Sequence, residues 1–165
     1  MWRRRGPLFV YPVLPAPRTA VLSTVFRGGG AVRIFDPASP ALIDDLKKFA
    51  PESVAATLPQ LDALAGSITL SHALIVLRSE SDSRLADSDY DHLWRAFRVP
   101  AFEQIVAEDG TLLAAECEAH DGLHIESVRL SRDPHEIDES ACPCGRPGAR
   151  IARRKQRGVA AGVSI

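Results

Sequence analysis

The sequence has no excess of either charge, no long hydrophobic run and only three cysteines. Its 20 Lys and Arg against 21 Asp and Glu leave a net charge of −1, so the molecule as a whole is not a polycation built for nucleic acid. No apolar run reaches the roughly 18 residues that a membrane span requires. Hydrophobic residues at 45% and charged residues at 25% of 165 residues exclude wholesale disorder and collagen-like or coiled-coil architectures. We therefore expect a soluble, cytoplasmic protein.

The first hundred residues predict alternating helices and strands. Residues 1–17 are basic and proline-rich, which predicts an extended lead-in. We expect a short helix over 18–27 that ends at Gly28-Gly29-Gly30, and a later helix with Ser39 as its N-cap and Pro40 at its first position. The other expected elements are strands over 31–35, 53–57 and 72–77 and helices over 59–65 and 88–97. This alternation with short connections predicts an α/β fold on a mainly parallel sheet with flanking helices.

After Pro100 the pattern changes to an antiparallel β-meander. Strand-like runs over 101–106, 111–118 and 123–130 are separated by Asp109-Gly110 and Asp121-Gly122, which are hairpin-turn dipeptides. We expect residues 18–150 to form a single α/β domain. Residues 151–165 are expected to form a basic, flexible tail.

The three cysteines and one histidine predict a metal site. Cys142 and Cys144 lie in a C-P-C-G turn, and Cys117 lies before the Asp121-Gly122 turn. A two-residue turn would pair His124 with Ala119, and a four-residue loop would pair it with Cys117. In both cases His124 shares a strand face with Cys117, because side chains on one face recur at every second residue, whereas His120 points to the other face.

Cys117, His124, Cys142 and Cys144 form a Cys3His set, which suits a closed, structural zinc site. Such a site would hold the C-terminal segment against the hairpin. The alternatives are that His120 replaces His124 as a ligand, or that Cys117 is simply a small buried hydrophobic residue and the other two cysteines are incidental.

Other candidate groups favour ordinary structural roles. The glycine triplet follows an expected helix and precedes a strand, the reverse of a phosphate-binding loop. His72 at a strand start and His92 on a helix are interpreted as surface or core residues. The acidic run between Glu80 and Asp91 is interpreted as a solvated face.

One segment and the cysteine pair carry a resemblance to a known family. Residues 115–125, A-E-C-E-A-H-D-G-L-H-I, are similar to an E-C…D-G-L-H motif, and C-P-C-G-R at 142–146 resembles an associated cysteine pair. Both occur in the phenylacetate–CoA ligase-like branch of the adenylate-forming superfamily. The segments 18–35, 41–64 and 72–104 add a likeness of pattern, so that the resemblance covers roughly residues 10–150.

Departures from that family determine the function that we expect. The family's aromatic-glycine-x-Thr/Ser-Glu motif would follow Gln104, where Ile105-Val106-Ala107-Glu108 stands instead. The family's Ser/Thr/Gly-rich phosphate loop, ribose-binding aspartate and C-terminal lysine domain have no counterpart in the sequence. Because those groups neutralise the triphosphate charge, we expect no adenylation.

The resulting prediction is a zinc-binding accessory or ligand-binding domain derived from an acyl-adenylating ligase, without catalytic residues. Its expected partners are a protein, or a second copy in a homodimer, and a weakly bound apolar or aromatic carboxylate; neither a membrane nor nucleic acid is expected. One alternative is a split or divergent AMP-forming acyl- or aryl-CoA ligase half that needs a partner chain. The other is a nucleic-acid-binding protein that uses the basic tail.

Overall fold

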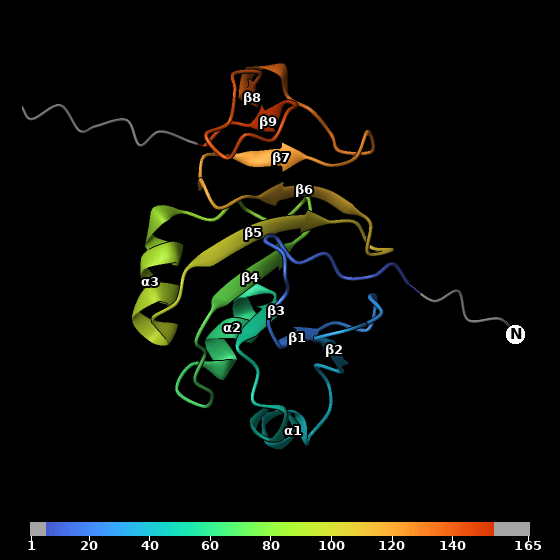
Figure 1. The fold of residues 1–165 in the computed structure, drawn as a ribbon, viewed down its shortest axis with the longest axis vertical. Coiled ribbons are helices and arrows are strands. Elements are labelled where there is room, and N and C mark those ends of the chain that lie inside the picture. The colour runs from blue at the N-terminus through green and yellow to red at the C-terminus, as the bar shows by residue number, and fades with distance from the viewer. Residues whose placement is uncertain (1–5, 154–165) are drawn as a thin grey trace, which may run out of the picture.

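The computed structural model describes residues 6–153, and within that range the strands form one mixed sheet of nine strands (Figure 1). The strand order is β2-β1-β3-β4-β5-β6-β7-β9-β8. The strands are β1 (Thr19–Leu22), β2 (Val32–Phe35), β3 (Ser53–Ala56), β4 (Ala73–Arg78), β5 (Ala101–Val106), β6 (Leu112–Glu116), β7 (Leu123–Ile125), β8 (Ile137–Asp138) and β9 (Arg150–Ile151). The helices are α1 (Leu42–Phe49), α2 (Leu58–Leu64), α3 (Asp87–Phe97) and the short 3-10 helix η1 (Pro134–Glu136).

Strands β1 to β5 are parallel to one another, and this part confirms the predicted α/β fold. Every residue of β4 is buried, as expected for a strand covered on both faces. The main core lies between the sheet and the three helices. Its fully buried members include Leu46 of α1, Leu61 of α2, Leu74 of β4 and Leu93 of α3.

Local sequence explains the helix boundaries. Thr57 and Gln60 form a reciprocal capping box at the start of α2. Helix α1 ends at Ala50 in the left-handed region, directly before Pro51. The predicted cap of α1 is wrong by two residues, because Ala41 occupies the N-cap and Ser39 Oγ accepts a hydrogen bond from the Ala41 N–H in the preceding turn.

The helix predicted over 18–27 is wrong. Residues Thr19–Leu22 are strand β1, buried at every position and paired on both sides, with β2 and with β3. Their apolar run fits helix or strand spacing equally, and the two flanking strands decide between them. The prediction that the glycine triplet terminates a helix is therefore wrong as well. Gly28–Gly30 form the tight turn into β2, where Gly29 N–H donates to Val32 O.

The lead-in packs against the sheet. Phe9 and Tyr11 are buried in a second apolar cluster with Ile75 and Leu77 of β4. The Tyr11 hydroxyl lies 2.9 Å from Ser53 Oγ, and Gln104 Nε2 donates to Val10 O. The described part of the lead-in thus covers part of the sheet, while residues 1–5 and 154–165, which include most of the predicted tail, lie outside the described range.

The antiparallel part follows the predicted turn at Asp109-Gly110. Strands β5, β6, β7, β9 and β8 pair antiparallel in that order, and Figure 1 shows them at one end of the sheet. Gly110 has a φ of 85°, the left-handed conformation for which glycine is suited. In residues 6–153 no helix is both long and apolar enough to cross a bilayer.

Candidate metal centre

The structure brings Cys117, His124, Cys142 and Cys144 together near the end of the antiparallel part. Their ligand atoms all lie within 4.8 Å of one another. Cys117 Sγ is 3.6 Å from Cys142 Sγ, and Cys144 Sγ is 3.3 Å from His124 Nε2. The four residues predicted from the sequence therefore form one cluster that could hold a metal ion.

Strand register explains why His124 belongs to the cluster. His124 of β7 stands opposite Ala115 of β6, and Cys117 follows Ala115 by two residues, so His124 and Cys117 share a face. The connection from β6 to β7 is longer than either loop considered from the sequence. The two pairing partners predicted for His124 are therefore wrong. The even spacing that places His124 and Cys117 on the same face is nevertheless observed.

His120 lies outside the cluster. Its backbone has a φ of 50°, in the left-handed region. Its imidazole packs on Phe102, with ring centroids 4.7 Å apart, and its Nδ1 lies 3.0 Å from Glu116 Oε1. The hydrogen bond to Glu116 raises the pKa of His120, although burial opposes the shift.

The C-P-C-G turn presents two sulfur atoms to one point. Gly145 has a φ of 82° and its N–H donates to Cys142 O, which closes the turn. The N–H of Arg146 donates to Cys144 Sγ at 3.4 Å. Cys117, Cys142 and His124 are buried and Cys144 is half-buried, so bulk water has little access to the cluster.

Electrostatics set the protonation of the ligand atoms. Burial, with added repulsion from Arg146 and Arg150, lowers the pKa of His124 and so favours the neutral imidazole that binds metals. Burial raises the pKa of Cys117 to about 12. Burial also acts to raise the pKa of Cys142, but hydrogen bonds from Cys144 and Cys117 outweigh it and leave that pKa lowered. A bound cation would be needed to hold Cys117 as a thiolate.

Arg150, which was not predicted from the sequence, anchors the segment that carries the cysteine pair. Its side chain is 1% exposed. Its guanidinium donates to Asp121 in the loop after β6, to Asp138 of β8 and to Ser140 beyond it. The feature of the sequence that could have predicted its burial is that this arginine interrupts the short apolar run Ala149–Ala152.

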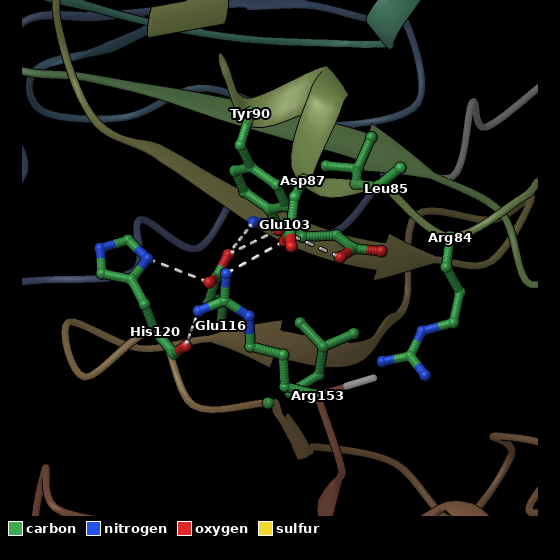
Figure 2. Close-up of a pocket in the computed structure, with 11 residues that line it drawn as sticks. Arg84, Leu85, Asp87, Tyr90, Glu103, Glu116, His120 and Arg153 are labelled. Atoms are coloured by element: carbon green, nitrogen blue, oxygen red, sulfur yellow. Dashed lines mark hydrogen bonds and ion pairs between the residues drawn. The ribbon is translucent and has the colours of Figure 1, made fainter. Parts of the chain in front are cut away.

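A second polar network, also missed, lies on the neighbouring strands β5 and β6 (Figure 2). Glu103 and Glu116 are both buried, and the N–H of Glu103 donates to Glu116 Oε2 at 2.9 Å. Arg78 pairs with Glu103, and the Tyr90 hydroxyl is 3.3 Å from Glu103 and 3.2 Å from Glu116. A glutamate in each of two mainly apolar strands was the signal for this network.

The remaining candidates take the ordinary roles expected of them. His72 directly precedes β4 and packs beside Tyr11. His92 lies on α3 and forms an exposed pair with Asp62 of α2 at 2.9 Å. Several acids of the 80–91 run serve turns and the start of α3, as when Ser79 N–H donates to Asp82 and Ala86 N–H donates to Asp89.

The fold is similar to that of 2-hydroxyisobutyryl-CoA ligase. Against the open conformation of that enzyme in complex with 2-HIB-AMP and CoA, the TM-score is 0.60 at 12% sequence identity, over 85% of this chain and 44% of that chain. Against its postadenylation state in complex with R3-HIB-AMP, the TM-score is 0.54 at 12% identity, over 85% of this chain and 43% of that one. No family model matches the chain, and no curated protein does.

At this identity the likeness shows the fold alone, and the chain spans less than half the length of those ligases. It confirms the predicted α/β fold, and the expected membership of the adenylate-forming superfamily stays a prediction. The narrower phenylacetate–CoA ligase-like branch stays a prediction.

Proposed function

We propose that this protein is a zinc-stapled, non-catalytic binding domain on the fold of an adenylate-forming ligase, related to the phenylacetate–CoA ligase-like branch. It acts as an accessory chain beside a protein partner. The observation that carries the proposal is the cluster of four Cys and His ligand atoms within 4.8 Å of one another.

The donor set suits zinc. Zinc takes sulfur and imidazole nitrogen in a tetrahedron, and Zn–S bonds of about 2.3 Å set two sulfur atoms about 3.8 Å apart. The 3.6 Å between Cys117 Sγ and Cys142 Sγ is close to that spacing. All three cysteines are free thiols, which suits a cytoplasmic setting where thiols stay reduced.

The role of the zinc is structural. Four protein ligands fill a tetrahedral site and leave no position for substrate or water. When bound, the ion would neutralise thiolate charge and cross-link two segments that are distant in sequence. Cys117 and His124 belong to the β6–β7 pair, while Cys142 and Cys144 belong to the loop between β8 and β9.

The ligand that we propose is an apolar or aromatic carboxylate, bound weakly at the carboxyl ends of the parallel strands. A crevice of about 340 Å³ lies there, between residues that follow β1, β2, β3, β4 and β5. Leu22, Phe26, Leu77 and Val106 give it apolar walls, and Thr57 and Ser79 add hydroxyl groups. In open α/β sheets this edge is the usual place for a ligand.

Adenylation is not part of the proposed function. At the end of β5 the chain has Ile105-Val106-Ala107-Glu108, without the glycine and the hydroxyl group that the resemblance implies for an adenylating enzyme. The charge that develops on a triphosphate in the transition state needs such donors, each of which supplies about 3 kcal/mol or more in a working enzyme.

Two measurements test the proposal. Elemental analysis should find about one zinc per chain in the wild type and the matched control His120→Ala, and none in Cys142→Ser or His124→Ala. Pyrophosphate release over aryl and fatty acids with ATP and magnesium should stay at the level of the no-protein control. Metal-free wild type isolated without chelators would contradict the zinc site, and acid-dependent pyrophosphate release would contradict the non-catalytic assignment.

A further inference from the structure

All three cysteines of the chain meet in the Cys/His cluster, which gives the cluster a second chemistry besides metal binding. Their sulfur atoms lie within 4.8 Å of one another, and Cys117 Sγ is 3.6 Å from Cys142 Sγ. All three are free thiols. The S–S bond of a disulfide is about 2.05 Å long, so a movement of about 1.5 Å brings the two closest sulfur atoms to bonding distance.

The three cysteines differ in their access to solvent. Cys117 is 1% exposed and Cys142 is 5% exposed, whereas Cys144 is only half-buried. As a metal ligand Cys144 would be a thiolate, which is the form of cysteine that reacts with hydroperoxides. Susceptibility to oxidation follows thiolate character and exposure, so Cys144 is the cysteine of the cluster that a small oxidant from solution meets first.

Position in the chain decides which sulfur atom completes a disulfide. Cys142 and Cys144 lie two residues apart in one proline-containing turn, where a disulfide would be strained and would join only neighbouring residues. Cys117 follows β6, in the other segment, and is 25 residues away from Cys142. A disulfide from Cys117 to the turn would therefore hold together the same two segments as a zinc ion does.

We propose that the cluster is a redox-exchangeable cross-link, in which a hydroperoxide replaces the zinc site by a disulfide between Cys117 and the C-P-C-G turn. The segment that carries the cysteine pair then stays attached to β6 and β7 after the zinc has left. This inference rests on the zinc site of the proposed function and adds the regulation of that site.

The reaction uses one molecule of hydrogen peroxide. The Cys144 thiolate attacks one oxygen, the O–O bond breaks, and a proton taken up by the leaving oxygen gives Cys144 sulfenic acid and water. The Cys117 thiolate then attacks Cys144 Sγ, the S–O bond breaks, and a second proton gives the disulfide and a second water. The peroxide gains two electrons and each sulfur atom loses one. Only His124 and Cys142 remain as metal ligands, too few for a tetrahedral zinc site.

The test adds hydrogen peroxide in equimolar amount to the full chain, after its zinc content has been measured. A chromogenic chelator should record release of the zinc, and the count of free thiols should fall from three to one. Peptide mapping should find the peptide with Cys117 joined to the peptide with the turn. Dimedone, which traps sulfenic acids, should label Cys144, and more strongly in Cys117→Ser. The control His120→Ala should react as the wild type does.

Hydrogen exchange tests whether the disulfide replaces the zinc as a cross-link. Reduced protein stripped by a chelator should exchange the amides of Arg150–Ile151 at least about tenfold faster than the zinc-loaded protein, whereas the oxidised, zinc-free protein should stay within about twofold of it. A thiol reductant with added zinc should restore the starting protein, because a disulfide is reversible and the higher sulfur acids are not.

Several outcomes would overturn the inference while leaving the zinc site in place. These are zinc-containing wild type that keeps its metal and its thiols under peroxide, a disulfide between Cys142 and Cys144, and dimedone found first on Cys117 or Cys142. Equally fast exchange at Arg150–Ile151 after oxidation and after chelation would also overturn it. Wild type that contains no zinc before oxidation would instead contradict the proposed function. The measurements on wild type decide the matter even where Cys117→Ser does not fold.

Discussion

The parallel and antiparallel parts of the sheet are held together by different interactions. The parallel part packs leucines from three helices against the parallel strands, and Leu46, Leu61, Leu74 and Leu93 are fully buried there. The antiparallel part has a smaller apolar cluster that includes Leu113, Leu123 and Ile151. Arg150, a charged residue of the antiparallel part, is the largest of the fully buried side chains in residues 6–153.

The difference shows how a segment with little apolar surface can be fixed to a larger core. Strands β8 and β9 have two residues each, too few to bury a useful hydrophobic face. Their place is held by Arg150, by its acidic partners and by the Cys/His cluster. Small units that lack a core of their own commonly depend on metals or cross-links in this way.

The largest expected effect comes from removing the proposed zinc ion, which should unfold the antiparallel part alone. Structural zinc contributes on the order of 10 kcal/mol to the folding of small zinc-dependent peptides. With chelator, we expect backbone amides after about residue 115 to exchange much faster, while β3, β4 and the three helices keep their protection. Hydrogen exchange with and without chelator measures this.

The matched control for metal removal is Cys142→Ser without chelator, which should give the same pattern of exchange. Uniform loss of protection across residues 18–97 would show that the two parts do not differ as described.

The next largest effect is expected from Arg150→Ala. The change removes a buried guanidinium that bonds Asp121, Asp138 and Ser140, and the two acids then lose their cation. The acids left behind are 53% and 34% exposed, so the loss comes mainly from the hydrogen bonds and from the space that the buried side chain filled, about 2–4 kcal/mol. Urea denaturation should show a loss near the middle of that range, whereas Arg129→Ala, which removes an exposed pair with Asp109, should change stability far less. A loss as small as that of the control would mean that Arg150 does not organise the segment.

A core substitution in the parallel part tests whether the two parts are stabilised independently. Leu74 of β4 is 0% exposed, and Leu74→Ala should cost about 3 kcal/mol through lost burial and an unfilled cavity. Because Leu74 lies in the parallel part, zinc content should stay at the wild-type level. Thermal unfolding and elemental analysis on the same preparation check both expectations. Loss of zinc in this variant would show that the two parts are coupled more closely than their packing implies.

Local pattern was enough to predict most elements of the parallel part. Strands β2 to β5 and helices α2 and α3 follow from apolar periodicity and from proline and glycine positions. Strand β1 could not be predicted in this way, because Thr19–Leu22 is a short apolar run whose conformation is decided by its neighbours β2 and β3. Tertiary pairing in this case overrides local spacing.

The candidate metal centre was partly predictable for a different reason. Side chains on one face of a strand recur at every second residue. This even spacing selected His124 over His120 as the ligand, although the predicted strand register was wrong. The network of Glu103, Glu116 and Tyr90 could not be found from spacing, since Tyr90 lies on α3 and meets the glutamates only through packing. Spacing within one hairpin is a local property, whereas contacts between a helix and two strands are not.

The smallest expected effect concerns pH and the His120–Glu116 pair. The hydrogen bond to Glu116 raises the pKa of His120 above its ordinary value of 6.5 in the folded state. A raised folded-state pKa means that the pair stabilises the protein fully below about pH 6.5 and that this contribution is lost as pH rises through the raised value. The side chain of His120 is 37% exposed, so solvent screening limits the effect to about 0.5 kcal/mol or less.

His120→Gln is the informative variant, because glutamine keeps a hydrogen-bond donor for Glu116 but carries no charge at any pH. Both proteins are zinc-loaded, so that titration of the metal ligands cancels in the difference between them. We expect the wild type to exceed the variant in free energy of unfolding at pH 6, and the gap to close by pH 9. A gap that stays constant over this range would show that the pair acts through shape and hydrogen bonding rather than charge. A gap that widens with pH would reverse the sign argued from the raised pKa. With a constant difference, the antiparallel part would depend less on charge than the comparison with the parallel part implies.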